Sequence, residues 1–323
     1  MVPSRMRVVG LVAAAAIVVG ACTSSGATAS PTTAPTATPV VTIGPAVTAA
    51  PTPAPTPTPA PTQKIVGSVP ADQLVLPGKL VICSDIPYPP QEFFDAQANP
   101  TGSDLDIGGE IAKRLSLQVE VQNSVFDTII LALTGGKCDI IISAQNITAA
   151  RLKQVDMIPY FQAGQSFLVQ KGNPENIQTG LDLCGKSVAA ESGTTEVDAL
   201  NGTGDYKGQG LSAACNKAAK PAITVKTFDK DSDALLALQS GQVSCYFTDA
   251  PVAGYYVKQH PDQVDLAPFS VNVIKEGISV GQDKAQLEAA VKAALQSMMD
   301  DGTYLTILTK WGLEANAVTS TNP

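Results

Sequence analysis

Two stretches of the chain decide how it folds: Leu131-Ala-Leu-Thr-Gly-Gly-Lys-Cys-Asp-Ile-Ile141 and Leu236-Ala-Leu-Gln-Ser-Gly-Gln-Val-Ser-Cys-Tyr-Phe247. Each begins with apolar residues at helical spacing and continues through glycine, a residue that commonly ends a helix. Each then closes in a short apolar run, which is typical of a buried strand. Because the same order of helix, stop and strand occurs twice, the simplest interpretation is two similar α/β lobes.

The flanking sequence extends this alternation of strand and helix. In the first half, apolar runs predict strands at 80–83, 118–121 and 139–143, and helical spacing predicts helices at 106–115, 126–133 and 148–155. In the second half, strands are predicted at 187–190, 223–225 and 245–247, with helices from 193, at 231–238 and at 251–259. Helices at 284–299 and 304–311 follow, with Trp311 in the core of the last. Such alternation predicts mostly parallel sheets flanked by helices.

The N-terminus has the features of an export signal. Arg5 and Arg7 precede an apolar run at 8–21 that is too short to span a bilayer but has the length of a signal sequence. The run ends in Val19-Gly-Ala-Cys22, which resembles the bacterial lipobox, whose cysteine is lipidated after cleavage. We therefore expect residues 1–22 to be a lipoprotein signal with lipid on Cys22. An ordinary cleavable signal is the alternative.

A low-complexity segment follows the signal. Residues 23–63 contain no charged residue and are rich in Pro, Thr and Ala. Proline fixes φ and lacks an N–H, so this segment cannot build helix or sheet. We expect residues 23–68 to form a disordered, semi-extended linker that tethers the folded part to the membrane surface.

The charge balance excludes several classes of function. The chain has 21 Lys+Arg against 29 Asp+Glu, for a net charge of −8. Without a basic cluster it lacks the positive surface that nucleic acid requires, so we expect no nucleic-acid partner. The single histidine, His260, argues against a multi-histidine metal site and a histidine-based triad, and we expect it at the surface. We expect neither a metal nor a cofactor.

Chemically useful residues follow the predicted strands. In open parallel sheets, ligands bind beyond the carboxyl ends of the strands. Those positions hold one cation, two carboxylates, a Gly-Thr helix start, a serine and a tyrosine: Asp85, Tyr88, Ser143, Arg151, Gly193, Thr194, Thr195 and Asp249. A zwitterion needs an anion site and a cation site a few ångströms apart, and this set supplies both.

From about Leu80 to Leu313 the chain resembles the family 3 solute-binding proteins, the amino-acid-binding receptors of ABC importers. The resemblance rests on motifs in order, namely Gly102-Ser-Asp-Leu-Asp-Ile-Gly-Gly-Glu-Ile-Ala-Lys-Arg-Leu115, Phe126-Asp127, Gly136-Lys-Cys-Asp-Ile-Ile-Ile-Ser143, Asn146-Ile-Thr148, Arg151, Pro159-Tyr160, Gly164-Gln165, Leu181-Asp-Leu-Cys-Gly-Lys-Ser-Val188, Gly193-Thr-Thr195, Asp249, Asp301-Gly-Thr-Tyr304 and Trp311-Gly312. It implies a two-lobe periplasmic-binding-protein type II fold with two hinge crossings. Lobe 1 would comprise 69–164 and 274–315, lobe 2 would comprise 165–273, and 316–323 would be a flexible tail.

The resemblance also implies contacts to the backbone groups of an amino acid. Arg151 would clamp the α-carboxylate through its guanidinium, assisted by backbone N–H groups of Gly193, Thr194 and Thr195. Asp249 would accept the α-ammonium. Ser143, the Ala144 backbone and Asn146 would form a shelf beneath both groups, although the family more often has Ser or Thr at the position of Asn146.

Three further positions would contact the rest of the ligand. The resemblance implies that Tyr88 and Phe126 sandwich its stem, and that Asp85 meets the side chain of a basic amino acid. Structural roles are the alternatives: loop packing for Tyr88, a core position for Phe126, helix capping for Asp249 and Thr194–Thr195, and a solvated helix position for Arg151. For Asp85 the two kinds of role are evenly balanced.

The cysteines other than Cys22 divide into two groups. The resemblance suggests a disulfide between Cys184 and Cys215, which an environment outside the membrane permits. We expect Cys83, Cys138 and Cys245, in or beside predicted strands, to be small core residues. No cysteine spacing indicates a metal site.

Together these features predict a receptor that is lipid-anchored on the extracytoplasmic face of the membrane. It would capture an amino acid, with polar or basic side chains favoured, and deliver it to an ABC permease. We expect a monomer that is not an enzyme. A ligand-sensing receptor subunit and a dehydratase-like enzyme on the same fold are the alternatives.

Overall fold

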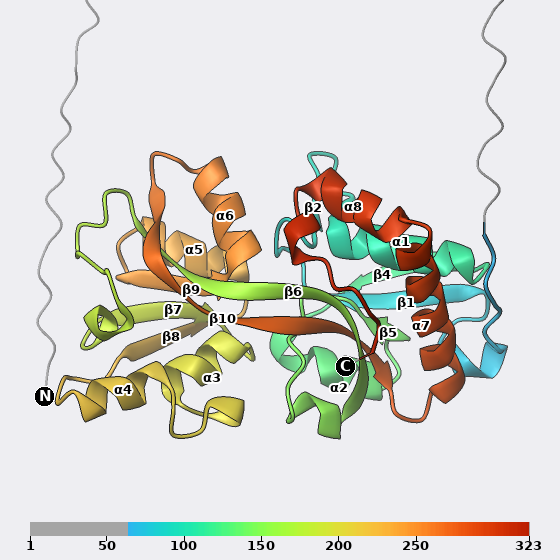
Figure 1. Ribbon diagram of the computed structural model, residues 1–323, viewed down its shortest axis with the longest axis horizontal. Coiled ribbons are helices and arrows are strands. Elements are labelled where there is room, and N and C mark those ends of the chain that lie inside the picture. The colour runs from blue at the N-terminus through green and yellow to red at the C-terminus, as the bar shows by residue number, and fades with distance from the viewer. Residues whose placement is uncertain (1–63, 323) are drawn as a thin grey trace, which may run out of the picture. The chain divides into compact units, whose positions relative to one another are not determined.

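The computed structural model describes residues 64–322, which form two lobes joined by two long neighbouring strands (Figure 1). The proposed signal with Cys22 and residues 23–63 of the linker lie outside these described residues. Residues 64–68, which we assigned to the linker, contact the first lobe. The Val66 N–H donates to the Arg114 carbonyl at 3.0 Å.

The first lobe is built from both ends of the described chain. Its strands are β1 (Lys79–Ser84), β4 (Gln118–Asn123) and β5 (Ile140–Ile141), with a two-stranded sheet of β2 (Phe93–Phe94) and β3 (Pro100–Thr101). Its helices are α1 (Ser103–Arg114), α2 (Ile129–Thr134), α7 (Ala285–Asp300) and α8 (Thr303–Trp311). The helix predicted at 148–155 is wrong in length, because only Arg151–Lys153 of that segment is helical and it forms a 3-10 helix.

The second lobe is one continuous segment with the same alternation. Its strands are β7 (Ser187–Glu191), β8 (Thr224–Phe228) and β9 (Cys245–Asp249). Its helices are α3 (Thr195–Asn201), α4 (Leu211–Lys217), α5 (Asp231–Gln239) and α6 (Ala250–Gln259). The prediction of two α/β lobes is therefore confirmed at the level of secondary structure.

The long strands β6 (Val155–Gln170) and β10 (Val264–Gly281) connect the lobes. The strand order is β4-β1-β5-β10-β6-β9-β7-β8. β1 pairs in parallel with β4 and β5, and β7 pairs in parallel with β8 and β9. β6 and β10 pair antiparallel with each other and with β9 and β5. The sheet is thus parallel towards the edges and antiparallel in the middle.

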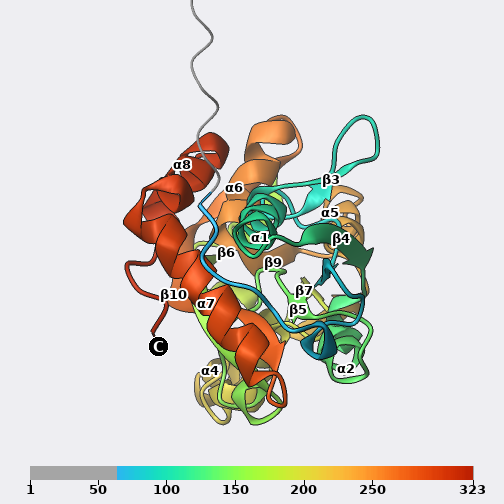
Figure 2. The same cartoon turned by 90° about the vertical axis from the view of Figure 1, so that its right-hand side faces the viewer.

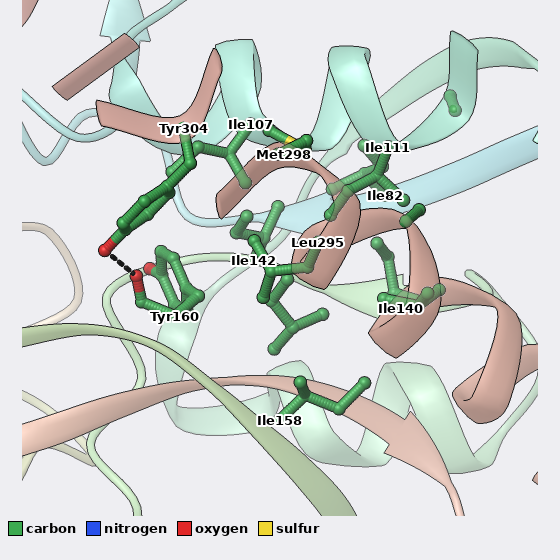
Figure 3. Packing of buried hydrophobic residues seen from close by; sticks show 14 of the residues in the cluster. Ile82, Ile107, Ile111, Ile140, Ile142, Ile158, Tyr160, Leu295, Met298 and Tyr304 are labelled. Atoms are coloured by element: carbon green, nitrogen blue, oxygen red, sulfur yellow. Dashed lines mark hydrogen bonds between the residues drawn. The ribbon is translucent and has the colours of Figure 1, made fainter. Parts of the chain in front are cut away.

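The apolar core of the first lobe explains why its helices lie where they do. Ile107, Ile111 and Leu115 recur at helical spacing, and all three are buried. Figure 3 shows Ile107 and Ile111 with strand residues of the same cluster, and Figure 2 shows α1, α7 and α8 side by side on this lobe. A Cβ on Gly108 would lie 2.7 Å from a side-chain carbon of Ile82, so glycine allows α1 to approach β1 closely.

In the second lobe, aromatic residues from the connecting strands complete the core. Phe167 on β6 stacks on Phe247 of β9 at 4.0 Å between ring centroids, and on Phe269 of β10 at 4.7 Å. Because β6 and β10 pack into the cores of both lobes, each lobe is continuous with the hinge that joins them.

The disulfides correct one prediction and confirm another. Cys184 and Cys215 are bonded, as the resemblance implied. Cys83 and Cys138 are also bonded, so the prediction that these two are free core residues was wrong. Cys83 lies on β1 and Cys138 just before β5, and these strands are parallel neighbours, which brings their Cα atoms to 5.7 Å. Cys245 is free and buried, as predicted.

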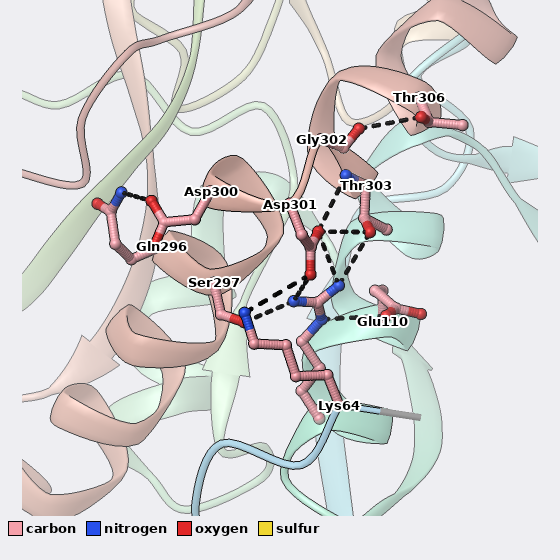
Figure 4. Close-up of polar contacts among 10 residues, drawn as sticks. Lys64, Glu110, Gln296, Ser297, Asp300, Asp301, Gly302, Thr303 and Thr306 are labelled. Carbon is pink, nitrogen blue, oxygen red and sulfur yellow. Dashed lines mark hydrogen bonds and ion pairs between the residues drawn. The ribbon is translucent and has the colours of Figure 1, made fainter. Parts of the chain in front are cut away.

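A polar cluster fixes the C-terminal helices to α1 (Figure 4). Arg114 donates through both terminal nitrogens to Asp301, which precedes α8. Beyond α8, the Val318 N–H donates to the Tyr304 hydroxyl at 2.9 Å. The described residues of the expected flexible tail therefore contact lobe 1. Trp311, expected in the helix core, is only partly buried, and its indole N–H donates to Asp106.

Candidate functional site

A small pocket lies between the lobes. Its lining comes from both lobes and contains every predicted binding residue except Gly193: Asp85, Tyr88, Glu92, Phe126, Ser143, Ala144, Asn146, Arg151, Glu191, Thr194, Thr195, Glu196 and Asp249. Gly193 lies beside it, since the Arg151 Nη2 donates to its carbonyl at 3.1 Å. The residues that were selected because ligands bind beyond strand ends therefore lie together around one pocket.

Arg151 reaches the pocket from a short turn of the first lobe. The Thr148 hydroxyl accepts the Arg151 backbone N–H at 3.1 Å. Arg151 is 9% exposed as a residue, and its guanidinium donates to the Asn146 carbonyl at 2.7 Å and lies over the Phe126 ring at 5.3 Å. Burial lowers its pKa, because the charged form loses hydration. Among residues 64–322, no ion pair engages this cation.

Asp249 ends β9 and immediately precedes α6 in the second lobe. Its side chain does not cap that helix. Instead its Oδ2 accepts the Tyr88 hydroxyl proton at 2.8 Å, and its buried Oδ1 has no hydrogen-bond partner. Burial raises its pKa well above the usual range, and the nearby Glu196 adds to that effect. The carboxyl is therefore aimed into the pocket with one acceptor unused.

The shelf residues Ser143, Ala144 and Asn146 follow β5. The Ser143 hydroxyl accepts the Asp85 N–H at 2.8 Å and donates to Glu92 at 2.7 Å. The Ala144 N–H donates to the Asp104 carboxyl at 3.0 Å. The Asn146 side-chain amide donates to the second lobe, while its buried oxygen lacks a partner. Most polar groups of this shelf are therefore fixed by the protein itself.

The two threonines at the start of α3 have different surroundings. The Thr194 hydroxyl donates to the Glu191 carbonyl at 2.7 Å. The Thr195 hydroxyl accepts from Asn146 at 2.8 Å and from Gln165 at 2.9 Å. Neither threonine provides a side-chain cap in the structure. The Thr195 side chain instead joins the second lobe to the shelf of the first, whereas Thr194 bonds within its own lobe.

Asp85 follows β1 and is buried. Its Oδ2 accepts the Phe126 N–H at 3.0 Å, and its Oδ1 forms an ion pair with Lys230 of the second lobe. Phe126 therefore connects two charged groups, because its ring lies under Arg151 and its backbone binds Asp85.

Sequence reasoning missed three carboxyl groups of the lining, Glu92, Glu191 and Glu196. Glu191 ends β7, so the strand-end rule could have selected it. Glu196 lies inside α3 and Glu92 in a proline-rich loop, where no pattern marked them. Burial raises the pKa of all three above the usual range. Including Asp85 and Asp249, the lining holds five carboxyl groups and one arginine, a composition that suits a ligand with net positive charge.

Two further findings bear on the class of protein. No cluster of three or more His, Cys, Asp or Glu within residues 64–322 is arranged to hold a metal ion. In the same part of the chain, no helix is both long enough and apolar enough to cross a membrane.

Comparison with known proteins identifies the family. Residues 80–314 match the bacterial extracellular solute-binding proteins, family 3. The lysine/arginine/ornithine-binding periplasmic protein of Escherichia coli K12 is 30% identical over 240 residues, which cover 71% of this chain and 85% of that protein.

Solved structures agree with this match. An ancestral arginine-binding protein bound to arginine is 36% identical, with a TM-score of 0.65, over 72% of this chain and 98% of that chain. An ancestral arginine-binding protein bound to glutamine is also 36% identical, with a TM-score of 0.66, over 73% and 99%. The predicted type II fold is therefore confirmed. The chain belongs to the bacterial extracellular solute-binding proteins, family 3.

Proposed function

We propose that this protein is the receptor of an ABC importer and captures an amino acid with a cationic side chain between its lobes. One observation carries the proposal: Arg151 of the first lobe and Asp249 of the second line one pocket that also contains Asp85 and Glu191. A buried cation and a buried carboxyl suit the two backbone charges of an amino acid. Additional carboxyl groups suit a positive side chain.

Arg151 would bind the α-carboxylate. Its guanidinium has five N–H donors, and two of its nitrogens bond the Asn146 and Gly193 carbonyls. Three N–H groups therefore remain, in the planar fork that matches a carboxylate. The lowered pKa reflects the cost of burying an unpaired charge, which a ligand carboxylate would offset.

Asp249 would accept the α-ammonium through Oδ1, the oxygen without a partner. Asn146 Oδ1 is likewise buried and unpartnered, so it is a second acceptor for the same group. A cationic side chain would then extend to Asp85 and Glu191, past the Phe126 ring. Arginine and lysine have the charge and the length for this arrangement.

Closure of the lobes would bury the ligand. Contacts that join the lobes surround the pocket, including Tyr88 to Asp249 and Asn146 to Thr195. Because β6 and β10 are the two connecting strands, rotation about their midpoints would open the cleft. The permease would then recognise the closed receptor and release the ligand for transport.

Isothermal titration calorimetry with a panel of amino acids tests this function. We expect arginine and lysine to bind one site per chain and acidic amino acids not to bind. Binding of an acidic amino acid in preference to the basic ones would contradict the proposal. Nuclear magnetic resonance spectra of each ligand after incubation address the enzyme alternative. We propose binding without turnover, so new product signals would refute that part.

We also propose that the protein is a monomer anchored through lipid on Cys22. The Val19-Gly-Ala-Cys22 sequence and the charge-free linker after it support the anchor. Cys22→Ala should move the protein from the membrane fraction to the soluble fraction of expressing cells. Light scattering of the folded part should give the mass of one chain, and a dimer mass would contradict the monomer.

A further inference from the structure

Lys230 is a cation that pairs with Asp85, a carboxylate of the pocket lining, and the proposed binding scheme does not use it. It lies between β8 and α5 of the second lobe, and its ammonium group pairs with the Asp85 carboxylate of the first lobe. The Asp85 side chain is 3% exposed and that of Lys230 is 26% exposed. The pair therefore crosses from one lobe to the other, with its acidic member buried and its basic member near the surface.

The surroundings of this pair are acidic. Burial raises the pKa of Glu191, and the nearby Asp85 charge raises it further. Glu191 Oε1 accepts the Asp231 backbone N–H at 3.0 Å, and the Asp231 carboxyl accepts the hydroxyl protons of Tyr246 and Tyr256. Of these groups, only Lys230 carries positive charge. Its ammonium group therefore lies where the cationic end of a basic amino acid would lie in our proposed function.

We propose that Lys230 is a resident counter-cation and an interlobe latch, which competes with the cationic side chain of the ligand for Asp85. This inference rests on the proposed function. A ligand guanidinium or ammonium group would displace the Lys230 ammonium, and the flexible lysine would turn into solvent, to which it is already partly exposed. A ligand with a neutral side chain would leave the Lys230–Asp85 pair in place.

Lys230 thereby sets the discrimination between cationic and neutral ligands. In its absence, arginine would meet an unpaired Asp85 and bind more tightly. Citrulline has nearly the same shape as arginine but an uncharged side chain. In its complex the Asp85 carboxylate would be buried without a partner, which is costly, so the affinity for citrulline would not rise. The ratio of the two affinities isolates the effect of Lys230 from general changes in the pocket.

The test compares Lys230→Met with the wild type and with Lys226→Met. Lys226 is an exposed lysine on β8 whose ammonium group bonds the Gln242 carbonyl within the second lobe. Calorimetry with arginine and citrulline should show the arginine-to-citrulline affinity ratio rising about tenfold or more in Lys230→Met. Lys226→Met should leave the ratio unchanged. An equal ratio in wild type and Lys230→Met would overturn the competition.

A second measurement needs no ligand. Small-angle X-ray scattering of the ligand-free protein at low salt should show a larger radius of gyration in Lys230→Met than in wild type, because the latch between the lobes is lost. An unchanged radius would overturn the latch. If wild type binds neither arginine nor citrulline, the proposed function fails, and the scattering result still decides whether Lys230 holds the lobes together.

Discussion

The Tyr88 hydroxyl of the first lobe donates a hydrogen bond to the Asp249 carboxyl of the second, at 2.8 Å between the oxygens. The same hydroxyl accepts the Asp249 backbone N–H at 3.2 Å and lies 3.1 Å from the Thr248 hydroxyl. Both residues are buried. The hydrogen bond that joins the two lobes therefore also positions the Asp249 carboxyl, the proposed acceptor of the α-ammonium group.

Tyr88→Phe should weaken ligand binding by about tenfold or more, because a hydrogen bond to a charged group contributes about 1.5–3 kcal/mol. Calorimetry with arginine measures the loss. Tyr255→Phe is a matched control, since Tyr255 lies outside the pocket and contacts Phe93 through its ring. Equal affinities in Tyr88→Phe and wild type would show that closure does not depend on this bond.

Gly193→Ala should hinder closure. Gly193 has a φ of +78°, and a Cβ there would lie 2.6 Å from the Asp127 Cα of the other lobe. We expect a loss of arginine affinity of about tenfold or more, with the fold of each lobe retained. Gly208→Ala has nearly the same φ, +76°, and no atom near its Cβ, so it introduces the same backbone strain without the clash. Similar losses in both variants would assign the effect to strain alone.

The unfolding free energy should fall as the pH rises from about 5 to 9. Burial raises the pKa of Asp104 to about 6 and that of Asp231 to about 8. The folded state therefore binds these protons more tightly than the unfolded chain, whose carboxyl pKa is about 3.9. Their contribution to stability is complete below that value and is lost as the pH rises through the folded pKa values.

Urea denaturation at pH 5, 7 and 9 measures this dependence. We expect a decrease of about 4 kcal/mol between pH 5 and 7, with about 2.7 kcal/mol from Asp231 and about 1.4 kcal/mol from Asp104, because the folded pKa of Asp231 lies above the whole interval. Asp104→Asn, which cannot titrate, should reduce the decrease over that interval by about 1.4 kcal/mol and leave the contribution of Asp231 in place. A wild-type stability that rises with pH over this range would contradict the assignment.

Removing the Cys83–Cys138 disulfide should lower the unfolding free energy by about 2–5 kcal/mol, because the bond constrains the unfolded chain. The comparison is the Cys184–Cys215 disulfide, whose sequence separation is 31 rather than 55. In the chain-entropy model, its removal should cost slightly less. Urea denaturation of the two alanine double variants measures both effects. No loss of stability for Cys83→Ala/Cys138→Ala would mean that the bond does not constrain the unfolded state.

The sequence predicts most of the elements that position the pocket, because each is a local pattern. Apolar runs mark the cores of β1, β5, β7 and β9, and the residues that end or follow them lie around the pocket as the strand-end rule requires. β6 and β10 were not predicted as long strands. Each passes from the core of one lobe to that of the other, so no single alternation of apolar and polar residues runs along its length.

Features that depend on long-range proximity could not be predicted. Cys83 and Cys138 meet only because β1 and β5 pair in the sheet. Lys230 meets Asp85 only because the lobes close on each other. Glu92 lines the pocket through a loop that carries no periodic pattern. In all three cases the tertiary arrangement creates the contact, and the local sequence contains no sign of it.

The central feature of the proposed site is an amino acid held by both of its backbone charges, and one calorimetric comparison tests this directly. Arginine and agmatine, which lacks the carboxylate, are titrated into wild type and Arg151→Ala. We expect wild type to prefer arginine by about 2–5 kcal/mol, the cost of removing one partner from a buried charge pair, and Arg151→Ala to lose that preference. Equal binding of arginine and agmatine by the wild type, or a preference that survives in Arg151→Ala, would contradict it.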